Sequence, residues 1–320
     1  MEMSPWVLRL VAACMLLFTG ITMTGAAEKT EAEKEATALM NQAFKAAQAQ
    51  EFTKAARLLG QAIEKDPKRG MLYGSRALIH EKAGMYNNAV ADYTSMIAFK
   101  GYQAKLQAEA KLEPEEAKPA WKVYQQRGEA NFRAGNIEAS IKDYDTYLKA
   151  QPNDEPYHWR RGISYYYAGQ YANGVKQFAL HQKVNPNDVE NAAWHFICNA
   201  KLVGVKKAQA EMIPIKQDRR GKWMMTILEM FAGKAKPFDV LLACRQGGPK
   251  KEQLDNRFCH AHLYIALFYE VQGNEKKAFE HMGKSAVDFQ FEHYMGAVSQ
   301  VHYNRMIKKR QAEKNKKSEK

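Results

Sequence analysis

Cysteine and histidine gather near the C-terminal end of the chain. Cys259, His260 and His262 lie within four positions, and His281 follows further along. Zinc prefers thiolate and imidazole ligands, and a zinc site needs three or four that converge. Side chains two positions apart on a helix point about 200° apart, so His260 and His262 cannot hold one ion together. We therefore predict no metal and no cofactor here, and a packing or surface role for the cluster.

Sequence motifs of catalysis are missing from the rest of the chain. It contains no H-E-x-x-H, no G-x-S-x-G, no G-x-x-x-x-G-K and no paired C-x-x-C, and its nine histidines are dispersed. We predict a protein that is not an enzyme and has no catalytic residues. The alternative, a metal-dependent enzyme centred on Cys259, would require stoichiometric metal in the purified protein.

The elements that carry these residues repeat with a period of 34 residues. Residues 121–154 and 155–188 abut without a gap and both end in Pro-Asn-Asp. Their Arg-Gly pairs align at position 7 and 8, their turn glycines at position 15, and Tyr144 aligns with Phe178 at position 24. The same register places two further repeats at 36–69 and 70–103. This pattern resembles the tetratricopeptide repeat, in which small residues let two antiparallel helices approach closely.

The repeats divide the chain into successive parts. In order, we expect a signal peptide or N-terminal anchor (1–27), a charged linker or helix start (28–35), two repeats (36–103), a helical insertion (104–120), two repeats (121–188), divergent hairpins (189–252), one repeat (259–292), a capping helix (293–312) and a basic disordered tail (313–320). The predicted fold class is all-α: a right-handed superhelical solenoid of about seven helical hairpins with a C-terminal capping helix.

Positions 7 and 23 of the repeats are predicted to join the two helices of a hairpin. Arg76 would pair with Asp92, and Arg127 with Asp143. In the next repeat Arg161 faces Gln177, which cannot form an ion pair, so we expect Arg161 to be the freest of the three arginines. We interpret these pairs as structural.

The concave face of such a solenoid is the expected binding surface. Positions 2, 5, 9 and 12 of the first helix line it, and aromatic side chains interleaved with arginines and amides suit a peptide. The candidate groove residues are Lys122, Gln125, Glu129, Phe132, Arg133, Trp159, Arg160, Ile163, Tyr166 and Trp194. Some of these aromatics would instead pack on neighbouring helices.

Residues 121–300 carry a more specific resemblance. A hairpin with a glycine turn leads into "FQFEHYMGA", and together they resemble the later part of NlpI-type tetratricopeptide lipoproteins of the bacterial envelope. The resemblance implies a periplasmic adaptor, often a homodimer, that brings cell-wall hydrolases together with a processing protease. This chain departs from the family in three respects: it has no convincing lipobox, it carries the insertion at 104–120, and it has a basic tail.

The first residues have the pattern of an export signal. After Arg9, residues 10–27 carry no charge and end in small residues, so we expect cleavage near Ala26 or Ala27, with an uncleaved anchor as the alternative. Lipidation at Cys14 is not expected, because the apolar run continues beyond it. Once the leader is removed, three cysteines remain, so they cannot all pair within the chain. A single disulfide between Cys244 and Cys259 is one alternative that the sequence leaves undecided.

The formal net charge of +13 is concentrated at the C-terminus. Residues 305–320 hold eight basic and two acidic side chains, a net charge of +6. Such a tail favours anionic wall polymer or a membrane surface, which gives the alternative function, whereas the leader argues against nucleic acid. The tail can equally serve solubility alone.

Overall fold

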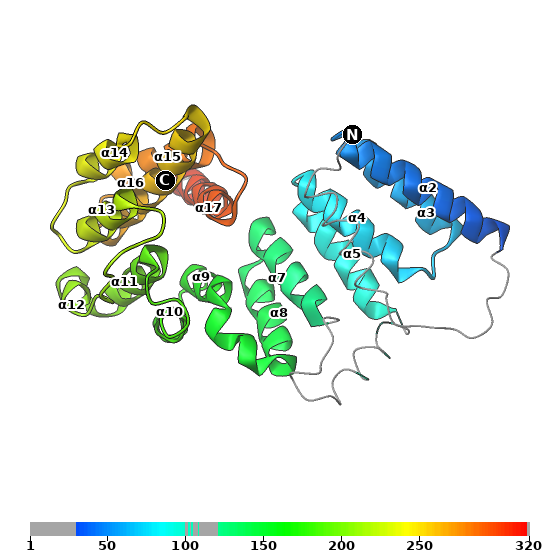
Figure 1. Cartoon of the computed structure of the whole chain (residues 1–320), viewed down its shortest axis with the longest axis horizontal. Helices are drawn as coiled ribbons and strands as arrows, with labels where there is room; N and C mark the ends of the chain where they lie inside the picture. Colours follow the sequence, from blue (N-terminus) through cyan, green and yellow to red (C-terminus); the bar gives the residue numbers. More distant parts are fainter. Residues whose placement is uncertain (1–29, 100–101, 103, 105–107, 109–120, 319–320) are drawn as a thin grey trace. The chain divides into compact units, whose positions relative to one another are not determined.

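The structure is a computed structural model that describes residues 30–99, 102, 104, 108 and 121–318. Within these residues the chain is helical and contains no strand (Figure 1). The expected leader (1–27) and nearly all of the expected insertion (104–120) lie outside the described residues. The chain divides into two compact units, Met1–Asn153 and Asp154–Lys320.

Within its described residues, the first unit consists of three helical hairpins. They pair α2 (Glu31–Gln48) with α3 (Phe52–Lys65), α4 (Gly70–Lys82) with α5 (Tyr86–Ala98), and α7 (Lys122–Ala134) with α8 (Ile137–Ala150). Thr30 caps α2 through a capping box with Glu33, which fixes the start of the helix. Consecutive hairpins pack through α3 with α4 and α5 with α7.

The second unit contains four hairpins and a long final helix. The pairs are α9 (Trp159–Tyr167) with α10 (Tyr171–His181), α11 (Val189–Val203) with α12 (Val205–Ala210), α13 (Lys222–Phe231) with α14 (Pro237–Arg245), and α15 (Lys251–Val271) with α16 (Glu275–Gly283). A short helix η2 (Pro152–Tyr157) precedes them, and the π-helical turn η3 (Lys284–Asp288) leads to α17 (Tyr294–Ser318). The described residues thus contain seven hairpins, in agreement with the predicted solenoid of about seven.

Glycine permits the close approach within a hairpin. A Cβ atom on Gly128 would lie 2.8 Å from the ring of Tyr144, and one on Gly162 would lie 2.7 Å from the ring of Phe178. Both pairs join position 8 of one helix to position 24 of the next. Gly135 and Gly169, with φ of 86° and 73°, make the turns between the helices.

The final helix differs from the expectation in two respects. It continues to Ser318, so residues 313–318, expected to be disordered, are helical. The cause is local, because no proline or glycine follows Gly296 and the segment is rich in lysine, glutamine, alanine and glutamate. Moreover, α17 packs on α15, α16 and η3 and also reaches α9, so its role exceeds that of an end cap. Among the described helices, none is both long and apolar enough to cross a membrane.

Candidate functional site

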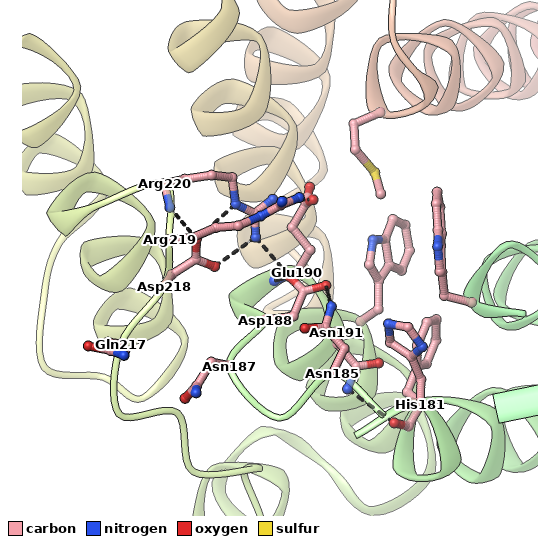
Figure 2. Close-up of a pocket in the computed structure, with 14 residues that line it drawn as sticks. His181, Asn185, Asn187, Asp188, Glu190, Asn191, Gln217, Asp218, Arg219 and Arg220 are labelled. Carbon is pink, nitrogen blue, oxygen red and sulfur yellow. Dashed lines mark hydrogen bonds and ion pairs between the residues drawn. The ribbon is translucent and has the colours of Figure 1, made fainter. Parts of the chain in front are cut away.

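A pocket of about 590 Å³ opens in the second unit (Figure 2). Its apolar wall comes from Trp159, Phe178, Trp194 and Met295, on α9, α10, α11 and α17. Polar groups complete the lining: the amides Asn185, Asn187, Asn191 and Gln217, with His181, Asp188, Glu190, Asp218, Arg219 and Arg220. Aromatic surface and convergent polar groups are the composition of a ligand-binding site.

Arg220 holds one wall of this pocket in place. Its Nε donates to Asp218 at 2.9 Å, one terminal nitrogen donates to Asp188 at 2.7 Å, and the other pairs with Glu190. Figure 2 shows the guanidinium extending between Asp218 and Asp188. The segment before α13 is thereby fastened to the start of α11.

The same carboxylates cap α11. Asp188 accepts a hydrogen bond from the backbone N–H of Glu190 at 3.0 Å, and Asp218 accepts one from that of Val189 at 3.1 Å. Both bonds satisfy N–H groups that the first turn of a helix leaves without partners. The wall is therefore built before any ligand arrives.

The electrostatics of this wall are uneven. Burial raises the pKa of Asp188, and nearby Glu190 raises it further, against the lowering effect of Arg220. Burial would also raise the pKa of Glu190, but the nearby charges of His260 and Arg220 lower it overall. Burial would likewise raise the pKa of Asp218, but hydrogen bonds from Arg220 lower it overall. One tightly held guanidinium thus faces three carboxylates, and Asp188 is the least compensated.

Two polar atoms in the pocket lining have no hydrogen-bond partner among the described residues. They are the indole Nε1 of Trp194 and the amide oxygen Oδ1 of Asn191. Trp194 is 1% exposed and Asn191 3% exposed. The amide nitrogen of Asn191 is fully used, since it donates to the carbonyl of Phe178 and to Gln182, each at 3.1 Å.

The ten candidate groove residues are distributed over both units. On α7, Lys122 is exposed, Gln125, Glu129 and Arg133 are half-buried, and Glu129 pairs with Arg133 at 2.9 Å. In the second unit the pocket brings together Trp159 and Trp194 of the predicted set. The guanidinium of Arg160 stacks on the rings of Trp159 and Tyr294, 4.5 and 5.1 Å from their centroids.

Four candidate residues are withdrawn into the interior: Trp194, which is 1% exposed in the pocket wall, and three others that do not line the pocket. Phe132 and Ile163 are 0% exposed and therefore pack rather than face a partner, because their positions on the first helix meet neighbouring helices. Tyr166 is 6% exposed, and its hydroxyl donates to Glu270 of α15 at 2.8 Å. These three contribute to the shape of a surface and not to direct contact.

The arginine–carboxylate pairs of positions 7 and 23 are both present. Arg76 binds Asp92 through two nitrogens at 3.0 and 2.7 Å, and Arg127 binds Asp143 likewise at 2.9 and 2.6 Å. Arg161 was expected to be the freest of the three arginines, but its side chain is the least exposed of them. It donates to Gln177 at 2.9 Å and pairs with Glu155 at 2.6 Å, a residue outside positions 7 and 23.

The cysteine–histidine cluster divides among separate contacts. His262 and His281 face each other with their Nδ1 atoms 2.8 Å apart. Burial is the largest cause that lowers the pKa of His262 to about 3, and the nearby His281 is the next largest. The thiol of Cys259 lies 3.8 Å from the carbonyl of Ser285 instead. Cys244 and Cys259 are both free, so the bridge left open by the sequence is not formed. Within the described residues no three such side chains could hold a metal ion.

A second pocket, of about 1000 Å³, lies where α17 meets α9 and α15. Glu270 is one of its lining residues, and its carboxylate accepts from Tyr166 at 2.8 Å and from Lys201 at 3.1 Å and pairs with His302 at 2.9 Å. The other ring nitrogen of His302 lies 3.0 Å from the hydroxyl of Tyr167. Burial would raise the pKa of Glu270, but His302 and Lys201 together lower it to about 2.

Comparison with known proteins places the fold. No protein-family model matches the chain. Serine/threonine-protein phosphatase 5 of rat is 30% identical over 122 residues, which are 38% of this chain and 21% of the phosphatase; the human enzyme is 29% identical over the same length. This chain thus matches about a fifth of the length of these relatives. A crystal structure of a tetratricopeptide repeat protein from Parabacteroides merdae is similar with a TM-score of 0.51 and 14% identity, over 86% of this chain and 99% of that one.

These comparisons and the hairpins define the class: the fold is an all-α tetratricopeptide-type solenoid. Solenoids of stacked hairpins present extended concave surfaces. Sequence reasoning missed most of the polar pocket lining, because Asn185, Gln217 and Arg220 lie between the helices, where the repeat pattern makes no demand. The signal nearest to them is the Pro-Asn-Asp ending at 186–188, whose aspartate binds Arg220.

Proposed function

We propose that this protein is a non-catalytic adaptor of the bacterial envelope that binds other proteins through the pocket around Trp159 and Trp194. The carrying observation is the preformed wall of that pocket, in which Arg220 joins three carboxylates beside exposed amides and an aromatic surface. Preorganised polar groups around an apolar centre are what a specific interface needs.

The envelope location is proposed from the sequence of the first 27 residues and from the resemblance of residues 121–300 to NlpI-type lipoproteins. The same resemblance suggests cell-wall hydrolases or a processing protease as partners, with a homodimer as the assembled form. Fractionation of cells and the intact mass of the mature protein test the location, and a mass that retains residues 1–27 would contradict cleavage.

Partner capture tests the pocket. The side chains of Asn187 and Gln217 are exposed, so the double variant Asn187→Ala with Gln217→Ala should keep the melting temperature while losing captured proteins from an envelope extract. The matched control is Gln272→Ala with Asn304→Ala, which removes the same two side-chain types from exposed positions that do not line this pocket. If both double variants capture partner proteins equally well, the pocket is not the partner-binding site.

The second candidate function is binding of anionic wall polymer or membrane through the C-terminal half of α17. It is favoured by the continuation of the helix to Ser318 and by the exposure of Lys308, Lys309 and Arg310. Deletion of residues 308–320 distinguishes the two candidate functions. If the tail binds anionic surfaces, the truncated protein should lose salt-sensitive binding to anionic vesicles, whereas protein binding through the pocket should be unchanged.

A further inference from the structure

The second pocket, of about 1000 Å³, carries an excess of positive charge. Six lysine and arginine side chains from α11, α16 and α17 line it, against three carboxylates, a net charge of +3. The pocket around Trp159 and Trp194 has three carboxylates and two guanidinium groups, a net charge of −1. These two pockets of the second unit therefore favour ligands of opposite charge.

Only two of the six cationic side chains are neutralised within the protein. Lys201 lies 3.1 Å from Glu270, and Lys309 lies 2.7 Å from Glu275 and 3.9 Å from Glu313. These pairs use all three carboxylates of the lining. In the part of the chain that the structure describes, the other four form no ion pair with a carboxylate: Lys276, Arg305, Arg310 and Lys314.

The four unpaired cations can be reached from solvent, because all four residues are exposed. Gly169 and Gly273 also line the pocket, and a Cβ atom added to either would meet no atom within 4 Å, so the space beside them is open. The guanidinium of Arg310 lies over the ring of Phe279, 3.5 Å from its centroid. A ligand thus meets an accessible cation that the protein already holds in place.

The spacing of two of these cations suits alternate residues of an extended peptide. Arg310 and Lys314 lie one turn apart on the same side of α17, about 6 Å along the helix axis. In an extended chain, side chains at alternate positions point the same way and are about 6.6 Å apart. The half-buried side chains of Tyr171 and Met306 add apolar surface to the same pocket.

We propose that the second pocket is a separate protein-binding site, which takes an extended acidic segment of a partner with carboxylates spaced as in Glu-x-Glu. Arg310 and Lys314 pair with the two carboxylates, and Lys276 contributes further positive charge from α16. The hollow favours a peptide over a membrane, because a planar bilayer does not fill a concave space of this volume. The inference goes beyond the proposed function: an adaptor that joins two proteins needs two sites, and this site does not depend on the pocket around Trp159 and Trp194.

Fluorescence anisotropy with the full chain tests the site. The probe is a labelled, capped heptapeptide of alternating alanine and glutamate, and its lysine counterpart tests the sign of the charge. The pocket variant is Lys276→Gln with Lys314→Gln. The matched control is Lys308→Gln with Lys316→Gln, which removes the same two charges from exposed positions of α17 that do not line the pocket.

The glutamate peptide should bind to saturation, and the lysine peptide at least about tenfold more weakly. The pocket variant should weaken binding of the glutamate peptide about fivefold through two lost ion pairs, and the control variant less than about twofold. Both variants should keep the melting temperature of the wild type, because the substituted side chains are exposed. Asn187→Ala with Gln217→Ala should bind the peptide as the wild type does.

Three results would overturn the proposal. Equal weakening by the pocket and control variants would mean that the net charge of the tail, and not the pocket, attracts the peptide. Equal binding of the lysine peptide would exclude recognition by charge. Binding of phosphatidylglycerol vesicles or inorganic polyphosphate without binding of the glutamate peptide would assign the cations to a membrane or an anionic polymer.

The same measurements keep this inference apart from the proposed function. If the glutamate peptide does not bind while partner capture depends on Asn187 and Gln217, the adaptor function stands and the second site fails. If the peptide binds through Lys276 and Lys314 while capture does not depend on Asn187 and Gln217, the second site stands and the function of the first pocket fails.

Discussion

At the scale of single residues, the contacts inside each hairpin depend on size rather than on polarity. Gly128 and Gly162 each face an aromatic ring at a distance that leaves no room for a methyl group. The charged pairs behave differently: Asp92 and Asp143 are 3% and 4% exposed, and each also binds a neighbour one turn after the arginine, His80 at 2.9 Å and Asn131 at 3.0 Å. Position 11 therefore belongs to the same hydrogen-bond network as positions 7 and 23, and the sequence pattern of those two positions did not reveal it.

We expect Gly128→Ala to lower the free energy of unfolding by about 1–3 kcal/mol, because the added methyl group overpacks the contact with Tyr144. The matched control is Gly60→Ala in α3, where the nearest atom would lie 3.5 Å away and φ is ordinary. It should instead stabilise the chain by about 0.5–1 kcal/mol through helix propensity. Urea unfolding followed by circular dichroism measures both changes, and equal effects would contradict the close-approach argument.

The three cysteines after residue 27 should be unreactive in the folded chain. All three are buried and free, and burial raises their pKa values, that of Cys244 to about 12 and that of Cys259 to about 11. A chromogenic thiol reagent at neutral pH should modify less than about a tenth of them natively, because the thiolate is the reacting form. In denaturant all three should react. Only one reactive thiol there would reveal a disulfide.

At the scale of elements, the contact of α17 with α9 and α15 distinguishes the second unit from a simple stack. Glu270 and His302 form its buried ion pair, and Arg305 donates to the carbonyl of Tyr167 at 3.1 Å. Repeats that touch only their sequence neighbours cannot produce such a contact. The final helix therefore joins hairpins that are far apart in the sequence.

Acid should weaken this contact. The folded pKa of Glu270 is about 2, below the ordinary glutamate value, so its stabilisation is complete above about pH 4.5 and is lost as the pH falls toward 2. We expect the wild type to lose about 3 kcal/mol more stability than Glu270→Gln over that range. Urea unfolding at a series of pH values measures the difference. The control is Glu275→Gln, whose carboxylate is largely exposed beside Lys309.

If the wild type and Glu270→Gln show parallel curves below pH 4.5, the ion pair with His302 does not stabilise the unit. A curve for Glu275→Gln that matches Glu270→Gln would show that any lost carboxylate has the same effect. Either result would mean that apolar contacts, and not this ion pair, hold α17 against its neighbouring helices.

At the scale of the whole molecule, α17 divides into a buried half and an exposed half. Met295, Ala297, Val298 and Val301 are at most 6% exposed, whereas residues 308–316 are all exposed. The first half completes the core of its unit, and the second half carries most of the basic charge of the C-terminus.

Truncation at two points should separate these halves. Ending the chain after Gln290 should cost more than about 4 kcal/mol of stability, since several large apolar side chains lose their burial at about 1.5–3 kcal/mol each. Ending it after Ile307 should change the stability by less than about 0.5 kcal/mol, because it removes exposed residues. Near-ultraviolet circular dichroism and urea unfolding report on both, and equal loss would contradict the division.

The sequence by itself determined the all-helical class, the repeat register from residue 36 to 188 and the arginine–carboxylate pairs, because each depends on contacts within 34 residues. That Trp159 and Trp194 belong to a binding surface stays a prediction of the sequence, although both line one pocket. Only the tertiary structure decided that Phe132 and Ile163 are buried and that Arg161 pairs with Glu155. It alone decided, too, that Arg220 and Met295 enter the pocket, because those contacts join segments whose separation no period encodes.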